Sequence, residues 1–254
     1  MNNKIKFYRS DSRLMNDAVD RIVVEMYRRK KERGDKTFIF TGCSSDVGTT
    51  SVSINLAIAL SVAGWKTVLV DCDMRKCDEF KRLNEKSGKG VVDYLEKSVL
   101  LKDICYGTDY ANLHYIPCGA DTNVSPVRLL CSTKMENLVE ELKDECDFVL
   151  FDFPSIDIVP DADILIPYID AVALVAAIRK TTKRQLAEAK AKMEIYEDKY
   201  AGLIINRVDM MQYRKYNHDY DYFQIDNLKN RYEKNVKKNS ESSKNAEKNG
   251  RRAE

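Results

Sequence analysis

The chain has 254 residues and a formal net charge of +2, from 42 basic and 40 acidic side chains. Its apolar fraction of 44% excludes a wholly disordered chain, and its length favours one domain, or one domain with an appendage. The balanced charge argues against a broad nucleic-acid-binding surface. Because the sequence shows neither an apolar run of about 18–20 residues nor a secretory signal, we expect a cytoplasmic protein.

The seven cysteines are scattered, and none forms a Cys-x-x-Cys pair. The two histidines lie far from any metal-ligand pattern. We therefore expect reduced thiols, most of them buried. The cysteines are Cys43, Cys72, Cys77, Cys105, Cys118, Cys131 and Cys146.

Residues 1–35 are polar and contain one amphipathic stretch, which predicts an N-terminal helix or arm. Four apolar residues at i, i+3, i+4 and i+7 give a helix one apolar stripe: Val19, Ile22, Val23 and Met26. The basic run 28–31 closes that helix, where cations suit the negative end of the helix dipole. The run predicts a solvated helix end, with contact to anionic lipid, a partner or a phosphate as the alternative.

Residues 36–208 alternate short apolar runs with helical patterns. Several runs are apolar at nearly every residue, which is typical of strands in a parallel sheet covered by helices on both faces. Alternating strands and helices imply right-handed crossovers, so we predict an α/β fold with a doubly wound, mostly parallel sheet flanked by helices. The predicted strands are 37–41, 67–71, 113–117, 148–152, 171–177 and 203–206, and the predicted helices are 52–63, 135–143 and 183–196.

Residues 209–254 form a third region, a polar tail that contains tyrosines. Its end, 233–254, is nearly without large apolar residues, so we expect the tail to be largely disordered. The i, i+3, i+7 spacing of the first three tyrosines also allows one helical face packed on the domain. The five tyrosines are Tyr213, Tyr216, Tyr220, Tyr222 and Tyr232.

A candidate phosphate-binding loop follows the first predicted strand, where residues 38–51 read FIFTGCSSDVGTTS. A strand, a small-residue loop and a helix start bring backbone N–H groups and the helix dipole onto one anion. The usual P-loop ends in Gly-Lys-Ser/Thr. Gly48 and the hydroxyls of Thr50 and Ser51 fit, but Thr49 occupies the Lys position. An ordinary strand–helix turn remains the alternative for this loop taken alone.

Three carboxylates follow two of the predicted strands. Asp71 and Asp73 end one strand, and Asp152 ends another. Because the carboxyl ends of parallel strands share one rim, these groups should face the same ligand. Singly, each is a candidate helix cap or turn residue. Together, beside a phosphate-type loop, they indicate a nucleotide site with Mg²⁺.

The motifs resemble those of the cytoplasmic tyrosine kinases of bacterial capsule and exopolysaccharide systems. These belong to a wider group of deviant P-loop ATPases that includes the Min and Par partition ATPases. The likeness covers about residues 37–208 and implies a P-loop NTPase-like kinase domain. VLVDCDMRK resembles the Asp-x-Asp-x-Arg motif and FVLFDFPS the Walker B segment. The matching segments are 68–76, 90–95, 117–130, 148–155, 161–182 and 202–207.

The resemblance implies ATP and Mg²⁺ as cofactors. The implied catalytic residues are Asp71, Asp73 and Asp152, and the implied metal-site residues are Thr50, Asp71 and Asp152. The implied nucleotide-binding residues are Asp46, Val47, Gly48, Thr49, Thr50, Ser51, Arg75 and Asn206, with Asn206 at adenine. The five tail tyrosines would be the phosphoacceptors, each entering the site of a neighbouring subunit.

The same resemblance implies partners and a location. A transmembrane chain-length or activator protein would hold the kinase at the inner face of the cell membrane. The kinase itself would form a homo-oligomeric ring, and a cognate tyrosine phosphatase would reverse its reaction. No nucleic-acid partner is expected.

Several residues depart from the family pattern. Thr49 replaces the Walker lysine, and Ser45-Asp46 replaces a small Pro-Gly pair, which adds negative charge near the phosphates. Arg128 replaces a glutamate, and 17–21 is at most a remnant of the Glu-x-x-Arg-x-x-Arg interface pattern. Three hypotheses therefore stay open: an autokinase, a catalytically impaired scaffold that binds a membrane chain-length regulator, and a partition-type ATPase switch. Arg75, Lys76 or Arg128 are candidate substitutes for the missing cation.

Overall fold

The computed structural model describes residues 5–7, 13–75, 88–97, 99–119 and 124–209, without the side chains of residues 13 and 14. The chain divides into two compact units, Met1–Arg207 and Val208–Glu254. The description below concerns the first unit. The tail tyrosines lie outside the described residues.

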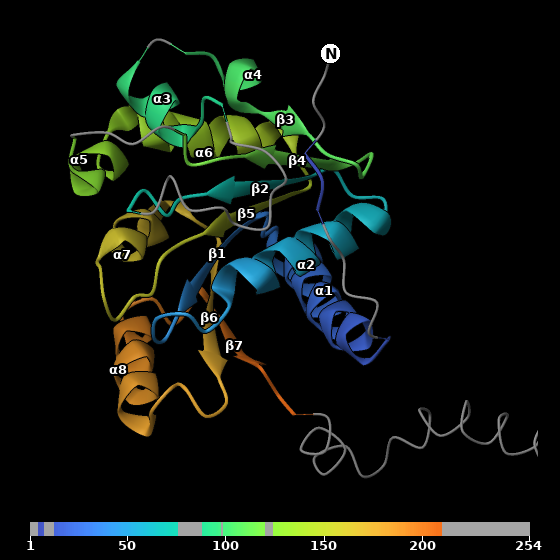
Figure 1. The fold of residues 1–254 in the computed structure, drawn as a ribbon, viewed down its shortest axis with the longest axis vertical. Helices are drawn as coiled ribbons and strands as arrows, with labels where there is room; N and C mark the ends of the chain where they lie inside the picture. The colour runs from blue at the N-terminus through green and yellow to red at the C-terminus, as the bar shows by residue number, and fades with distance from the viewer. Residues whose placement is uncertain (1–4, 8–12, 76–87, 98, 120–123, 210–254) are drawn as a thin grey trace, which may run out of the picture. The chain divides into compact units, whose positions relative to one another are not determined.

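Within the described ranges, seven strands form one sheet in the order β3-β4-β2-β5-β1-β6-β7. All neighbouring pairs are parallel except β3 and β4, so the predicted doubly wound, mostly parallel sheet is confirmed (Figure 1). The strands are β1 Thr37–Gly42, β2 Thr67–Asp71, β3 Tyr106–Gly107, β4 Leu113–Ile116, β5 Phe148–Asp152, β6 Ala171–Ala177 and β7 Tyr200–Asn206.

Helices cover both faces of the sheet. Figure 1 shows α1 and α2 on one side and α6, α7 and α8 on the other. The helices are α1 Arg13–Arg33, α2 Thr49–Val62, α3 Val91–Glu96, α4 Leu101–Ile104, α5 Pro126–Leu130, α6 Thr133–Glu145, α7 Asp161–Leu165 and α8 Lys183–Glu194, with a 3-10 turn η1 Ile166–Tyr168.

Two large apolar cores result, one on each face, because successive strand side chains point to opposite faces. In β1, Phe38 and Phe40 enter the core under α1 and α2, whereas Ile39 enters the other core. The strands β1, β2, β5 and β6 are buried at every residue. This burial explains why their sequences are apolar throughout.

Helix α1 packs on α2 through its apolar stripe, as its periodicity predicts. Val23 and Met26 are buried, and Val19 and Ile22 pack against the same core. None of the helices within the described ranges is long and apolar enough to cross a membrane.

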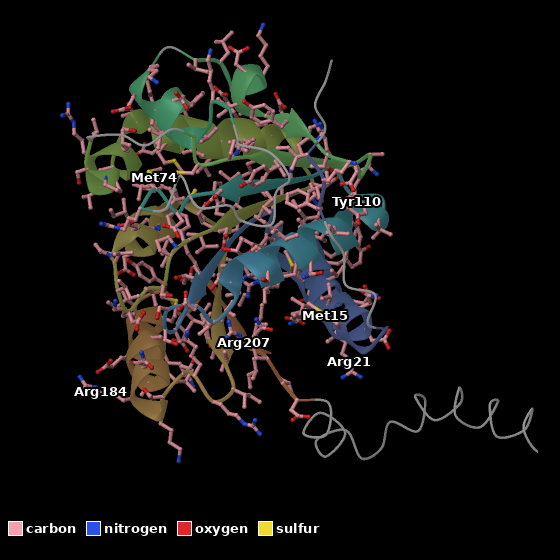
Figure 2. The ribbon with its side chains drawn as sticks, in the orientation of Figure 1. Met15, Arg21, Met74, Tyr110, Arg184 and Arg207 are labelled. Atoms are coloured by element: carbon pink, nitrogen blue, oxygen red, sulfur yellow. The ribbon has the colours of Figure 1, made fainter. Side chains whose placement is uncertain are left out.

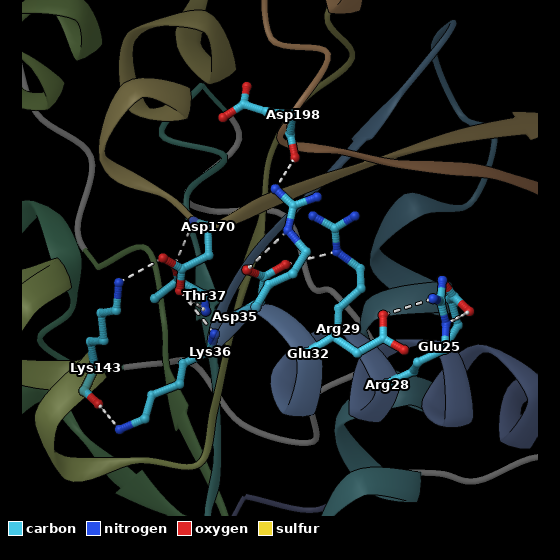
Figure 3. Close-up of polar contacts among 11 residues, drawn as sticks. Glu25, Arg28, Arg29, Glu32, Asp35, Lys36, Thr37, Lys143, Asp170 and Asp198 are labelled. Atoms are coloured by element: carbon cyan, nitrogen blue, oxygen red, sulfur yellow. Dashed lines mark hydrogen bonds and ion pairs between the residues drawn. The ribbon is translucent and has the colours of Figure 1, made fainter.

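The first three residues of the basic run near the end of α1 are ion-paired, as Figure 3 shows for Arg28 and Arg29. Arg28 pairs within the helix with Glu25 and Glu32, at 2.5 and 2.9 Å. Arg29 is buried and donates from Nε to Asp35 at 2.8 Å. Lys30 Nζ lies 3.5 Å from Asp147. These contacts favour a structural role for the run.

Most cysteines of the described ranges are buried, and one of these buried residues takes part in a disulfide bond. Cys43 and Cys146 are buried free thiols, and burial raises the pKa of Cys43 to about 11. Cys118 is disulfide-bonded, so the expectation of reduced thiols is wrong at that residue. Cys131 is exposed on the surface.

Candidate nucleotide site

The loop between β1 and α2 turns sharply at two residues. Gly48 caps α2 with φ +85°, and Asp46 has φ +48°. A Cβ atom on Gly48 would lie 2.5 Å from Asn206 Nδ2, so the close approach requires glycine. Thr49 is the first residue of α2, whose N-terminal N–H groups and dipole suit a phosphate.

Residues distant in sequence hold this loop in shape. Asn206 Nδ2 donates to the Val47 carbonyl at 2.8 Å, and Asn206 Oδ1 accepts from the Arg207 N–H at 2.8 Å. Ser155 Oγ donates to the Ser44 carbonyl at 2.7 Å. Asn206, expected at adenine, therefore also braces the phosphate loop.

Asp71 and Asp152 lie side by side at the carboxyl ends of β2 and β5. They are register partners, and adjacent strands are about 4.8 Å apart. Both are buried, at 6% and 3% exposure. Ser53 of α2 lies 3.4 Å from Asp152, and the Tyr115 hydroxyl donates to Asp71 at 3.3 Å. Burial, followed by the Asp71 charge, raises the pKa of Tyr115 well above its usual value.

Asp73 and Arg75 form a turn beyond β2. The Asp73 N–H donates to Asp71 Oδ1 at 3.0 Å, and the Arg75 N–H donates to Asp73 Oδ1 at 3.3 Å. The Arg75 guanidinium binds both oxygens of the fully buried Asp161, at 2.9 and 2.7 Å. These hydrogen bonds raise the pKa of Arg75. Arg75 thus lies at the site with its charge already paired.

A cavity of about 390 Å³ opens beside the loop, and Asp73 and Arg75 line it. The predicted site residues Ser51, Asp71, Asp152 and Asn206 are not among its lining residues. The lining mixes charged and apolar side chains, among them Ile158, which is 61% exposed. Its lining comprises Ser45, Asp46, Val47, Gly48, Thr49, Thr50, Asp73, Arg75, Phe153, Pro154, Ser155, Ile158, Val159 and Arg207. Figure 2 labels Arg207, the residue that follows β7.

The donor set fits Mg²⁺ bound largely through water and phosphate. Within the described ranges, no group of three or more His, Cys, Asp or Glu side chains is arranged to hold a metal. Mg²⁺ commonly takes only one or two protein carboxylates and completes its shell with waters and substrate phosphates. Asp71 and Asp152, with the hydroxyl of Thr50 on the adjacent helix, supply such a set.

The charges near the loop differ from those of a usual P-loop. Thr49 brings no cation, and the Asp46 carboxylate lies 3.1 Å from Lys180 Nζ. Lys180 comes from the connection between β6 and α8, so this pairing is visible only once the chain is folded. Of the earlier candidate cations, Arg128 lies on α5, and Lys76 falls outside the described residues.

Sequence reasoning missed several residues that the fold brings to the site. Tyr115 and Ser53 contact the paired carboxylates, and Ile158 and Arg207 line the cavity. Tyr115, Ser53 and Ile158 lie outside the matching segments, and Arg207 ends the segment 202–207 without a predicted role. Their positions depend on the strand order and on which face of a strand each side chain occupies.

The mostly parallel sheet, the loop between β1 and α2 and the strand-end carboxylates at one rim are those of a P-loop NTPase-type domain. A family model described as "AAA domain" matches residues 41–177. Tyrosine-protein kinase CpsD of Streptococcus agalactiae is 30% identical over 178 residues, covering 69% of this chain and 76% of that protein. CpsD of Streptococcus pneumoniae serotype 4 is 30% identical over 182 residues, covering 70% and 79%.

A solved structure agrees with these relatives. The VpsO kinase domain is 27% identical with a TM-score of 0.66, covering 78% of this chain and 98% of that one. The chain therefore belongs to the bacterial capsular and exopolysaccharide tyrosine kinase family, and the resemblance read from its motifs is confirmed.

Proposed function

We propose that this protein is a Mg²⁺- and ATP-dependent tyrosine autokinase that regulates capsule or exopolysaccharide synthesis. The observation that carries the proposal is the buried, register-matched pair Asp71 and Asp152, placed beside an amide-rich loop in a chain of this family. The phosphoacceptors would be the tail tyrosines, beginning with Tyr213.

Each part of the site has a task in phosphoryl transfer, which depends mostly on positioning and charge stabilisation. Bound Mg²⁺ and ATP would supply the phosphoryl group and neutralise its charge. The N–H groups of residues 46–51 would orient the phosphates, and Asn206 would keep that loop in shape. Thr50, Asp71 and Asp152 would hold the metal. Asp73 would accept the tyrosine hydroxyl proton while that oxygen bonds to the γ-phosphorus and ADP leaves.

The missing lysine sets the expected rate. An ammonium about 4 Å from a phosphate oxygen contributes on the order of 4 kcal/mol at an effective dielectric constant near 20. Its loss costs about 10²–10³ in rate, because each ~1.4 kcal/mol is tenfold. The backbone loop and the carboxylates remain, so nucleotide binding should survive better than catalysis.

Thr49 and Asp46 favour a second candidate, a catalytically impaired scaffold of the same family. Such a protein would bind a transmembrane chain-length regulator without transferring phosphate. A partition-type ATPase is less well supported, because the relatives that match at 30% identity are tyrosine-protein kinases.

The remaining features of the proposal follow from family membership. The protein would act at the inner face of the membrane through its transmembrane partner and assemble as a homo-oligomeric ring. A tyrosine phosphatase would remove the phosphate from its tyrosines. A ring would let the tail of one subunit reach the carboxylates of the next.

A phosphotyrosine map of the full chain tests the proposal. The protein is produced with its membrane partner, digested and analysed by mass spectrometry, beside Asp71→Asn and Thr49→Lys. Phosphate between Tyr213 and Tyr232 that disappears in Asp71→Asn supports the kinase. An unphosphorylated tail in both the native chain and Thr49→Lys would contradict the kinase and favour the catalytically impaired scaffold.

A further inference from the structure

Tyr115 is a buried polar residue of β4 for which the catalytic roles above have no use. It is 4% exposed, and its hydroxyl lies 3.3 Å from Asp71 Oδ2. A buried hydroxyl needs a hydrogen-bond partner, and here the partner is a carboxylate of the proposed metal site.

The strand register explains how the side chain reaches that far. β2 and β4 are parallel, and Tyr115 lies opposite Leu69. Asp71 is two residues further along β2, so its side chain is on the same face of the sheet. The tyrosine side chain therefore extends along the strand direction toward the rim where Asp71 faces Asp152.

A second contact fixes the ring. Phe7 packs edge-on against it, with ring centroids 5.5 Å apart at 90°. Phe7 is 3% exposed, and its N–H donates to Asp109 Oδ1 at 3.2 Å. The adjoining Ile5 bridges to Thr108, so the segment 5–7 is anchored on the edge of the sheet. The ring cannot swing away without disrupting this packing.

Both oxygens of Asp71 thus receive a donor, Oδ1 from the Asp73 N–H and Oδ2 from the Tyr115 hydroxyl. Donors behind a metal-binding carboxylate fix its orientation, and their loss typically weakens metal binding 10–100-fold. We propose that Tyr115 is a positioning residue that sets the Asp71 carboxylate for Mg²⁺. This inference rests on the proposed function, since it needs Asp71 to face the metal.

The test is a Mg²⁺ titration of ADP binding in the full chain. Affinity for ADP is measured by calorimetry across a Mg²⁺ series and in EDTA, for the native chain, Tyr115→Phe and Tyr106→Phe. Tyr106→Phe is the matched control, because it also removes a single tyrosine hydroxyl. Tyr106 lies on β3, the strand next to β4, and its hydroxyl donates to the main-chain carbonyl of Lys89.

Mg²⁺ should strengthen ADP binding, and we expect Tyr115→Phe to raise the Mg²⁺ concentration that gives half of this effect about tenfold. Its affinity in EDTA and that of the control should stay within about twofold of the native chain. The ratio of the two affinities within one variant cancels any loss of folded protein. A merely structural hydroxyl would lower both affinities together and leave that ratio unchanged.

A double-mutant cycle shows whether the effect passes through Asp71. In an Asp71→Asn background, Tyr115→Phe should produce no further change in Mg²⁺ dependence. An unchanged Mg²⁺ requirement in Tyr115→Phe, or full additivity in the cycle, would overturn the inference while leaving the proposed function intact. A native chain whose ADP binding ignores Mg²⁺ would overturn both.

Discussion

Replacing Thr49 with lysine restores the one cation that a P-loop ordinarily carries. Thr49 is the first residue of α2 and lines the cavity, so a lysine there extends from the loop toward the phosphates. At about 4 Å and an effective dielectric constant near 20, the ammonium contributes roughly 4 kcal/mol to the transition state. The rate of tail phosphorylation should therefore rise about 10²–10³-fold.

The assay is single-turnover transfer from radiolabelled ATP to the full chain, at saturating nucleotide. Val62→Lys, at the exposed end of α2, is the matched control for adding a positive charge to this helix away from the loop. An unchanged rate in Thr49→Lys, with ATP affinity intact, would refute the reasoning. It would place the deficit in Asp46 or elsewhere in the loop rather than in the missing cation.

Three further outcomes follow from the geometry. Gly48→Ala places a Cβ at a residue with φ +85°, where it meets Asn206. The substitution should lower the free energy of unfolding in urea by roughly 1–3 kcal/mol and weaken ATP binding. An unchanged free energy of unfolding and an unchanged ATP affinity would contradict the strain. Asp46→Ala removes a carboxylate and releases Lys180, so ADP should bind several-fold tighter by calorimetry; equal or weaker binding contradicts a repulsive role. Burial, followed by the charge of Lys66, lowers the pKa of His114 in the folded chain. As the pH falls, the unfolded chain therefore binds this proton at a higher pH than the folded chain, and the free energy of unfolding decreases below about pH 6.5. His114→Gln should flatten that dependence, and an unaltered slope assigns it to other groups.

Strand positions were predictable because burial on both faces leaves a continuous apolar signature. β1, β2, β5 and β6 are buried at every residue, and the predicted runs match them closely. β7 begins at Tyr200 rather than Leu203, because Tyr200, Ala201 and Gly202 do not extend the run of large aliphatic residues that predicted the strand. The two-residue strand β3 and the helices of four to six residues are too short to show a period.

Site chemistry was predictable where a motif is local. Asp71 and Asp152 end predicted strands, and Gly48 lies in the loop after the first strand. The fold brings these three residues to one rim of the sheet. Contacts that join distant segments were not: Asn206 lies 159 residues from Val47, and Tyr115 lies 44 residues from Asp71. Such pairs depend on strand order and on alternation between faces, which one sequence leaves open.

A second segment of α1 bears on the N-terminal interface pattern. We placed a remnant of Glu-x-x-Arg-x-x-Arg at 17–21. In α1 the same spacing is met more closely by Glu25, Arg28 and Lys31, with lysine in the last position. Glu25 and Arg28 form an ion pair on an exposed face of α1.

Calorimetry of ATP binding to the full chain, with and without Mg²⁺, tests the central claim most directly. We expect ATP to bind with a dissociation constant in the micromolar range or weaker. Binding should strengthen with Mg²⁺, be competed by ADP and lose its Mg²⁺ dependence in Asp71→Ala and Asp152→Ala. No heat and no competition by ADP would contradict every nucleotide-dependent role proposed for this protein.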